Sequence, residues 1–296
     1  MPEIRHGVNP DGSTSFIVVP GVERAAQPAA EAVPVLPVAT APLLEIRDLQ
    51  VEYAQHGTLR AVDGVSLTIG RGETVGLVGE SGCGKSTLSR AVMRLAPVAS
   101  GQILLDGVDL VPLGERALRP LRPRVQMVFQ DPYASLNPRR TVGQILGRVL
   151  AANGARERQA RSAVALDKVG LPVAALHRFP HEFSGGQRQR IDIARALVLE
   201  PALLICDEPV SALDVSIQAQ ILNLLVELKH SLGLSLLFIS HDLSVVRYLA
   251  DSVHVMQRGK IVEHGDHRSV WRAPQHPYTR TLLDAVPGRE AVAQAA

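Results

Sequence analysis

A glycine-rich segment that ends in lysine, serine and threonine, GESGCGKST at residues 79–87, carries the strongest chemical signal in the sequence. It matches the spacing G-x-x-x-x-G-K-[ST], in which backbone N–H groups surround phosphate oxygens. Lys85 would place a cation on the β and γ phosphates of a nucleotide, and Ser86 would offer a hydroxyl to Mg²⁺. The segment therefore predicts a site for a nucleoside triphosphate.

The glycines and the flanking residues supply the context that such a loop requires. Gly79, Gly82 and Gly84 would let the backbone approach a polyphosphate without Cβ atoms in between. Residues 74–79 form a short apolar run that predicts a buried strand, and residues 86–95 have the periodicity of an amphipathic helix. This helix would point the positive end of its dipole at the same anion. A chance glycine-rich turn is disfavoured because strand, loop and helix occur in the required order.

Paired acids follow a second buried strand. Residues 202–206 are a continuous apolar run, as expected for a central parallel strand, and Asp207 and Glu208 come directly after it. Buried carboxylates are costly unless a cation or a proton transfer uses them. Hydrolysis of a nucleoside triphosphate needs one acid to support Mg²⁺ and one to orient or deprotonate the attacking water. An exposed acidic turn is the alternative, and the phosphate loop upstream disfavours it.

Two further polar residues follow apolar strands. Gln130 ends the predicted strand 125–130, and His241 comes directly after the predicted strand 235–240. A lone histidine is more often structural. Here the phosphate loop, Gln130, the paired acids and His241 each follow the carboxyl end of a predicted parallel strand, which is where ligands bind in open α/β sheets. We therefore expect all of them at one edge of one sheet.

A second helix start also has the chemistry of an anion site. Ser184, Gly185 and Gly186 precede an apolar periodic segment that continues to residue 200, without a lysine at its start. Tyr53, near the end of the predicted strand 43–54, has an aromatic face on which an adenine could stack. By spacing alone a strand tyrosine is more often part of the core.

Composition limits the class of protein. The chain has 296 residues, a mass of 31.8 kDa and a formal net charge of +2, which argues against a dedicated nucleic-acid binder. It contains 2 cysteines, far too few for a disulfide framework, so a reducing cytosol fits best. No apolar run approaches the roughly 18 residues of a membrane span, so we expect any membrane association to go through a partner.

The remaining segments predict how these residues are positioned. Residues 43–54 and 59–69 predict two strands of an antiparallel β subdomain beside the phosphate loop. Residues 101–110 predict a hairpin with an Asp-Gly turn. Residues 141–169 predict two helices, and residues 216–232 predict another. Residues 19–42 are rich in Pro and Ala without periodicity, and we expect residues 1–41 to be mostly disordered.

These residues resemble the ATP-binding subunits of ABC transporters from residue 43 to the carboxyl terminus. The motifs stand in the family's order: the Walker A segment GESGCGKST, the glutamine loop at Gln130, the signature FSGGQ, the Walker B run ALLICDE, the SALD loop and the histidine of SHD. The segments QDPYASLNPRRTVG, PHEFSGGQRQRI and HPYTRTLLDAVP resemble the dipeptide/oligopeptide and nickel importer group, particularly its F-type ATPase subunit.

The resemblance implies an α/β fold of the P-loop NTPase class, an ABC ATPase domain with a mixed core sheet, an antiparallel β subdomain and a helical subdomain. It also implies roles for single residues. Glu208 would be the general base, His241 would contact the γ-phosphate, and Gln130 and Lys85 would assist catalysis. Mg²⁺ would be held by Ser86, Gln130 and Asp207. ATP would be bound by Tyr53, by Gly79, Glu80, Ser81, Gly82, Cys83, Gly84, Lys85, Ser86 and Thr87, and, across a dimer interface, by Ser184, Gly185, Gly186 and Gln187.

The same resemblance implies domains, partners and location. Residues 1–41 would precede the ATP-binding domain at 42–272, whose helical subdomain would span about 131–200, and residues 273–296 would form a carboxyl-terminal extension. A second ATPase subunit, by the group's habit a paralogue, would form a head-to-tail dimer with this chain. Two membrane permeases and, indirectly, an extracytoplasmic binding protein would complete an importer. The chain would lie peripherally at the cytoplasmic side of the inner membrane and energise uptake of di- or oligopeptides.

Departures from the family pattern and other functions are also part of the prediction. Asp192 stands in the signature helix where the family commonly has a small residue, so the packing there should differ. No cysteine follows Cys206, so an iron–sulfur cluster is not implied. Cys83 stands at a helix N-terminus, which favours a lowered thiol pKa. Nickel or another small solute remains an alternative cargo. A non-transport ABC ATPase and a nucleotide-binding regulator without hydrolysis are less favoured.

Overall fold

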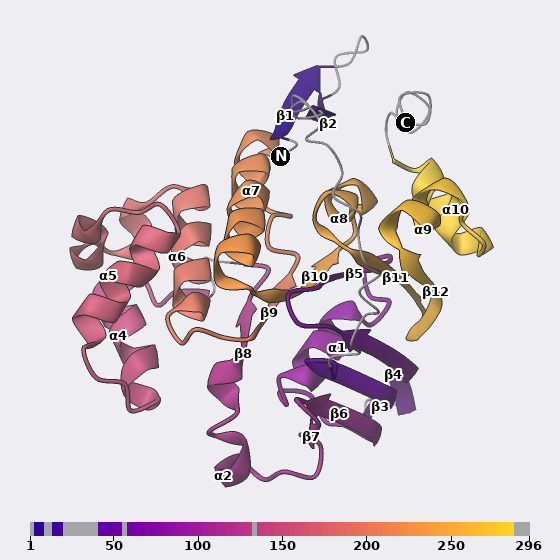
Figure 1. Ribbon diagram of the computed structural model, residues 1–296, viewed down its shortest axis with the longest axis horizontal. Helices are drawn as coiled ribbons and strands as arrows, with labels where there is room; N and C mark the ends of the chain where they lie inside the picture. The colour runs from indigo at the N-terminus through magenta and orange to yellow at the C-terminus, as the bar shows by residue number, and fades with distance from the viewer. Residues whose placement is uncertain (1–2, 9–13, 20–40, 55–57, 132–134, 287–296) are drawn as a thin grey trace, which may run out of the picture.

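The computed structural model describes residues 3–8, 14–19, 41–54, 58–131 and 135–286. Within these residues, a six-stranded sheet with the order β12-β11-β5-β10-β9-β8 forms the centre of the molecule (Figure 1). Its neighbouring strands from β11 to β8 pair in parallel, and β12 pairs antiparallel with β11, so the predicted mixed core sheet is confirmed. The strands span Thr74–Val78 (β5), Val125–Val128 (β8), Leu203–Asp207 (β9), Ser235–Ser240 (β10), Ser252–Gln257 (β11) and Lys260–Asp266 (β12).

The apolar strands of this sheet are covered on both faces, as their continuous apolar runs predict. Along β9, Leu204 and Cys206 pack with residues of α6 (Gly185–Leu197), α7 (Val215–Leu232) and α8 (Leu243–Leu249). Leu203 and Ile205 point to the other face and pack with α1 (Lys85–Val92) and the second sheet. The side-chain alternation of a strand thus places one apolar run in two cores.

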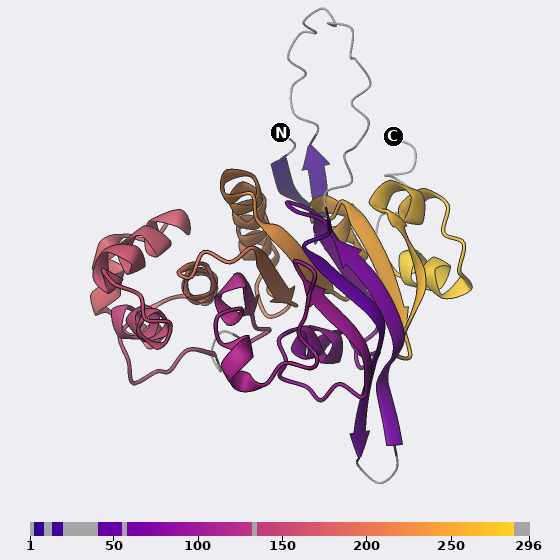
Figure 2. The ribbon, with the colours of Figure 1, turned by 60° about the horizontal axis from the view of Figure 1, so that its bottom comes forward.

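The second sheet is antiparallel, as predicted, with the order β4-β3-β6-β7 among the described residues. Its strands span Leu44–Ala54 (β3), Thr58–Ile69 (β4), Ser100–Leu105 (β6) and Val108–Asp109 (β7). The predicted hairpin turns at Asp106 and Gly107, whose φ angles of 48° and 77° are those that an Asp-Gly turn favours. This sheet packs beside α1 and so supports the phosphate loop from one side (Figure 2).

Helices extend the molecule beyond the two edges of the six-stranded sheet. On the β8 side lie α4 (Val142–Ala152), α5 (Arg158–Lys168) and α6, and on the β12 side lie α9 (His267–Arg272) and α10 (Pro277–Asp284) (Figures 1 and 2). The N-cap residues Thr141 and Ser184 each complete a capping box with the glutamine three residues later. Shorter turns are α2 (Glu115–Leu118), η1 (Arg122–Arg124), η2 (Val173–His177) and η3 (Pro180–Glu182).

Two stretches of the amino-terminal segment, which we expect to be mostly disordered, form strands. The strands Glu3–Val8 (β1) and Thr14–Val19 (β2) pair antiparallel, with Val8 opposite Thr14. Both runs contain β-branched residues, which favour strand structure even where the surrounding composition is rich in Pro and Ala. The other residues of the segment, 1–2, 9–13 and 20–40, lie outside the described residues.

In the described parts of the chain, no helix has both the length and the apolar character needed to cross a bilayer.

Candidate functional site

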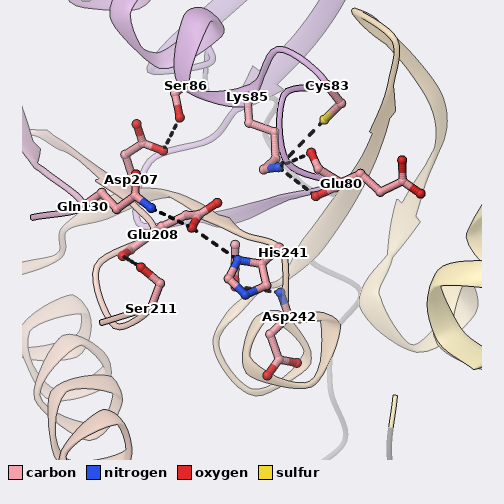
Figure 3. Close-up of polar contacts among 12 residues, drawn as sticks. Glu80, Cys83, Lys85, Ser86, Gln130, Asp207, Glu208, Ser211, His241 and Asp242 are labelled. Carbon is pink, nitrogen blue, oxygen red and sulfur yellow. Dashed lines mark hydrogen bonds and ion pairs between the residues drawn. The ribbon is translucent and has the colours of Figure 1, made fainter. Parts of the chain in front are cut away.

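The phosphate loop connects β5 to α1, as the sequence predicts. Gly84 is the N-cap of α1, and Lys85 is its first residue. The Lys85 side chain is buried, and its Nζ donates to the carbonyl oxygens of Gly79 at 2.7 Å and Glu80 at 2.8 Å (Figure 3). The loop therefore curls around its own ammonium group, which places a cation at the N-terminus of a helix. Both features attract phosphate.

Two of the three loop glycines are needed for a different reason than the sequence suggested. A Cβ atom on Gly79 would lie 2.2 Å from the carbonyl oxygen of Met256, and one on Gly84 would lie 2.2 Å from that of Ala61. These glycines allow the loop to pack against the neighbouring backbone. Gly82 has a φ of +79° and faces open space, so it alone of the three fits the predicted role of admitting a ligand.

Asp207 and Ser86 form the part of the site that fits a magnesium ion. The Ser86 hydroxyl donates to Asp207 Oδ1 at 3.0 Å, and the Ser89 hydroxyl lies 3.5 Å from Oδ2. Burial raises the pKa of Asp207, the hydrogen bond from Ser86 opposes this, and the charge of Glu208 raises it further. A cation at this position would favour the charged carboxylate. The described residues contain no group of three or more His, Cys, Asp or Glu side chains that could enclose a metal. Mg²⁺ is commonly held by one or two protein oxygens together with substrate phosphates.

Glu208 lies between the side chains of Gln130 and His241. Its Oε2 accepts a hydrogen bond from Gln130 Nε2 at 3.2 Å, and His241 Nδ1 lies 3.2 Å from the same oxygen (Figure 3). The backbone of Glu208 has a φ of +49°, which is uncommon for a residue with a side chain. The N–H of Glu208 donates to the carbonyl oxygen of Ile239, and the carbonyl oxygen of Glu208 accepts from the Ser211 hydroxyl. This strained and doubly anchored backbone aims the carboxylate at the edge of the sheet.

The structure thus brings together most of the predicted residues. The phosphate loop follows β5, Gln130 follows β8, Glu208 follows β9 and His241 follows β10, all at the carboxyl edge of parallel strands. The predicted strand 125–130 ends at Val128, and Gln130 stands just beyond it. The arrangement can hold a polyphosphate, a divalent cation and a water molecule next to a carboxylate, which is the chemistry of phosphoanhydride hydrolysis.

Five predicted residues are not part of this cluster. Tyr53 lies near the end of β3, half-buried and opposite Leu59 of β4, where it packs against the core that the second sheet shares with α1. Ser184, Gly185, Gly186 and Gln187 form the start of α6. A Cβ atom on Gly186 would lie 2.5 Å from Ile217, so this glycine allows α6 to approach α7.

Asp192 in α6 is a buried link to the segment around Gln130. Its carboxylate accepts from the backbone N–H of Phe129 at 3.3 Å and from the Ser135 hydroxyl at 2.9 Å. Arg195 pairs with it at 2.6 Å and donates to the Ser135 carbonyl at 2.6 Å. Burial raises the pKa of Asp192, and Arg195 and Ser135 oppose this. The sequence indicated only altered packing at this position. The structure shows a polar connection from α6 to the residue before Gln130.

Both cysteines are buried, and this corrects the expectation for Cys83. Burial raises the pKa of its thiol, although Lys85 Nζ, at 3.8 Å from Sγ, opposes the shift. Desolvation therefore outweighs the helix N-terminus, which was the basis for expecting a lowered pKa. Burial also raises the pKa of Cys206, and the charges of Asp192 and Asp207 add to the effect.

Two residues around the site were missed from the sequence: Ser89 and Tyr278, whose hydroxyl accepts from the Glu80 N–H at 2.9 Å. Asp192 was noted, but its hydrogen-bond partners were not foreseen. Ser89 follows Ser86 by three positions on a helix, a spacing that places both on one face and could have identified it. Asp192 and Tyr278 reach the site through tertiary contacts that spacing does not encode.

Comparison with known proteins identifies a matching family and several relatives. A family model described as ABC transporter matches residues 62–211. A putative peptide import ATP-binding protein of Brucella ovis is 53% identical over 250 residues, which are 83% of this chain and 79% of that protein. The oligopeptide transport ATP-binding protein OppF of Escherichia coli K12 is 51% identical over 259 residues, 83% of this chain and 78% of that protein.

Solved structures give the same result at the level of the fold. A dimeric ATP-binding cassette in a post-hydrolysis state, bound to ADP and Pi, superposes with a TM-score of 0.69 and 28% identity. The match covers 76% of this chain and 99% of that one. The protein cbiO1 from Clostridium perfringens, part of the cbiONQ ABC transporter complex, superposes with a TM-score of 0.72 and 30% identity. That match covers 86% of this chain and 99% of the other.

Proposed function

This chain belongs to the ABC transporter family of ATP-binding proteins, and on this premise we propose that it energises the import of di- or oligopeptides by hydrolysing ATP. The observation that carries the catalytic part is the position of Glu208, whose carboxylate lies beside Gln130 and His241 at the sheet edge from which the phosphate loop also starts. The cargo class is supported by relatives named for peptide import and oligopeptide transport.

The chain's own residues suggest how hydrolysis proceeds. Backbone N–H groups of the loop and the Lys85 ammonium would bind the phosphates of ATP, and Tyr53 would stack on the adenine. Glu208 would accept a proton from the attacking water, with Gln130 and His241 fixing the direction of its carboxylate. His241 would also donate to the γ-phosphate oxygens. Most of the rate acceleration would then come from positioning and electrostatics.

Ser86 and Asp207 are the side chains that we propose to hold Mg²⁺, with Gln130 completing the protein ligands. The bound ion would neutralise charge on the β and γ phosphates. Ser86 already donates to Asp207, so the two oxygens are placed within reach of one small cation. Asp207 is buried at the end of β9, which keeps its carboxylate oriented.

A second subunit would complete the site. Ser184, Gly185, Gly186 and Gln187 lie on α6, in the helical layer beyond β8, and would contact the ATP held by the phosphate loop of an opposing protomer. The dimeric form of the ADP-bound neighbour supports such a pairing. We propose a head-to-tail dimer with a paralogous ATPase. The ligand-bound closed state would be selected because ATP binds it better than the open state.

The helical layer also carries a basic depression that suits an acidic partner. Asn137, Arg139, Arg140, Gln144, Arg148 and Arg158 line it together with small residues, and none of its described lining residues is acidic. It lies on α4, the start of α5 and the loop that follows Gln130. We propose that a carboxylate-bearing cytoplasmic segment of a permease docks here.

Reversing one charge in this depression is expected to weaken assembly. Arg148 is exposed on α4, and Arg148→Glu should slow association with the permeases by about tenfold at low salt, less at high salt. Co-purification and association kinetics with the permease partners would measure this. The control is Arg116→Glu on α2, an equally exposed site with the same charge change. Equal effects of both variants would contradict the proposed docking site.

The domain boundaries remain our proposal. Residues 42–272 would be the ATP-binding domain, residues 131–200 its helical subdomain and residues 273–296 the extension, of which 287–296 lie outside the described residues. The chain would sit on the cytoplasmic face of the inner membrane through its permease partners. An extracytoplasmic binding protein would deliver the cargo.

Reconstitution tests the whole function. The chain, its paralogue and both permeases in lipid vesicles should hydrolyse ATP faster when a peptide-loaded binding protein is supplied, and peptide should enter the vesicles. Control vesicles with the same proteins receive Ni²⁺ in place of peptide. Stimulation by Ni²⁺ alone would overturn the peptide assignment, and hydrolysis without transport of any cargo would overturn the importer assignment.

A further inference from the structure

Hydrogen bonds to the side chains of Glu263 and His276 fix the beginning of the carboxyl-terminal helix α10. Glu263 of β12 accepts from the backbone N–H groups of Gln275 at 2.7 Å and His276 at 2.9 Å. His276 is the N-cap of α10, and its Nδ1 accepts from the N–H of Tyr278 at 3.2 Å. Pro277 occupies the first turn, where its missing N–H costs nothing. The residues His276, Pro277 and Tyr278 therefore begin α10, and this start fixes the direction of the Tyr278 side chain.

That third residue reaches the phosphate loop. Tyr278 is 8% exposed, and its hydroxyl oxygen accepts from the backbone N–H of Glu80 at 2.9 Å. Burial raises the pKa of Tyr278, and the hydrogen bond from Glu80 opposes this, so the phenol stays neutral at physiological pH. A neutral phenol retains its own proton and accepts through the oxygen. The contact joins two segments that are 198 residues apart in the sequence.

Glu80 is held from both sides of its backbone. Its N–H is bound by Tyr278, and its carbonyl oxygen accepts from Lys85 Nζ at 2.8 Å. The orientation of the first turn of the loop is thus set partly by α10. The neighbouring helix α9 is anchored as well, since Trp271 lies under the Arg247 guanidinium of α8 at 4.8 Å. Since Glu263 of β12 also fixes the start of α10, the position of this helix does not depend on the Glu80 contact alone.

We propose that α10 is a positioning element for the phosphate loop and that Tyr278 raises the affinity for ATP by holding the Glu80 backbone in its binding conformation. The inference rests on the proposed function, because it concerns the same nucleotide site. A loop that is ordered before the ligand arrives loses less entropy on binding. Tyr278 makes no described contact with Glu208, Gln130 or His241, so its influence should fall on binding and leave the chemical step unchanged.

A purely structural role for Tyr278 makes a different prediction. The ring belongs to the large core formed with α7 and α8, and it would stabilise the fold without any effect on the loop. Tyr278→Phe separates the two roles because it keeps the ring and removes only the hydroxyl. Leu282→Ala is the matched control, since Leu282 is a half-buried residue of α10 that packs on the same core and makes no described contact with the loop.

The experiment compares full-length wild type, Tyr278→Phe and Leu282→Ala. Equilibrium dialysis with MgATP should give a Kd about 3- to 10-fold higher for Tyr278→Phe, the loss expected for one hydrogen bond. In the assembled importer the KM for ATP should rise by the same factor while kcat stays within about twofold. In the absence of nucleotide, hydrogen exchange of the peptide covering residues 79–84 should be faster in Tyr278→Phe than in wild type. Leu282→Ala should lower thermal stability and leave Kd and loop exchange unchanged.

Each outcome decides one question. A wild-type Kd and wild-type loop exchange in Tyr278→Phe would overturn the positioning role while leaving the ATPase assignment intact. A rise of Kd in Leu282→Ala equal to that in Tyr278→Phe would also overturn it, because loss of packing alone would then suffice. Failure of the wild-type chain to bind MgATP would instead contradict the proposed function.

Discussion

Glu208→Gln is expected to reduce ATP hydrolysis by about 10²- to 10⁴-fold, the usual contribution of a positioned general base. The amide has the shape of the carboxylate but cannot take a proton from water. Lys85, Ser86 and the loop backbone are untouched, so ATP binding should persist, and the closed dimer should accumulate because it is no longer resolved by turnover. Single-turnover hydrolysis and equilibrium ATP binding, measured on the same preparation, check both parts.

Glu227→Gln is the control for this prediction. Glu227 is exposed on α7, so the substitution makes the same chemical change away from the site. It should leave turnover and binding at the wild-type level. If Glu208→Gln hydrolyses ATP as fast as wild type, Glu208 is not the base, and the water must be activated by phosphate oxygens or by another group.

Ser184→Arg is expected to lower turnover by about 10²-fold at every site that uses this serine, because a preorganised donor to the phosphates is lost. The long cationic side chain would also occupy the dimer interface. Because Ser184 caps α6, outside the cluster formed by Lys85 and Glu208, the isolated chain should bind ATP as wild type does. The assembled importer, loaded with ATP at each site, provides the measurement.

The loss of a helix cap must be separated from the loss of the interface. Ser184 and Thr141 cap their helices with the same capping box, so Thr141→Arg removes an equivalent cap from α4, and the two variants are compared in the isolated chain. Both variants should lose about 1 kcal/mol of stability, and their thermal unfolding should be similar. Unchanged turnover in assembled Ser184→Arg would show that opposing protomers do not share their sites through this residue.

The core of the fold was readable from sequence because its signals are local. Short apolar runs predicted β5, β9 and β10, and the Asp-Gly dipeptide predicted the turn between β6 and β7. Ser184 and Thr141 stand where caps are needed, and the helices begin directly after them. The convergence of Gln130, Glu208 and His241 followed from one rule, that the carboxyl ends of parallel strands share an edge.

The rest depends on contacts between distant segments. Asp192 looked like a misplaced charge in a helix, and only the fold shows Arg195, Ser135 and the Phe129 N–H around it. Tyr278 lies in a segment that resembles the importer group, but its partner is the backbone N–H of Glu80, which is 198 residues away in the sequence. Gly79 and Gly84 were assigned to ligand approach, whereas their close neighbours are the carbonyls of Met256 and Ala61. The periodicity of a sequence describes one segment at a time, so it does not show which distant segments contact each other.

The burial of both thiols has a practical consequence for spectroscopy. Cys83 and Cys206 are the only cysteines in the sequence, and in both the protonated form is favoured. Maleimide dyes and spin labels react with exposed thiolates, so they should pass over the native side chains. A cysteine placed on the surface of α5 or α9 would then carry the probe alone, without prior removal of the natural sulfur atoms. Distances between labelled protomers could be followed through a turnover cycle in otherwise unaltered protein.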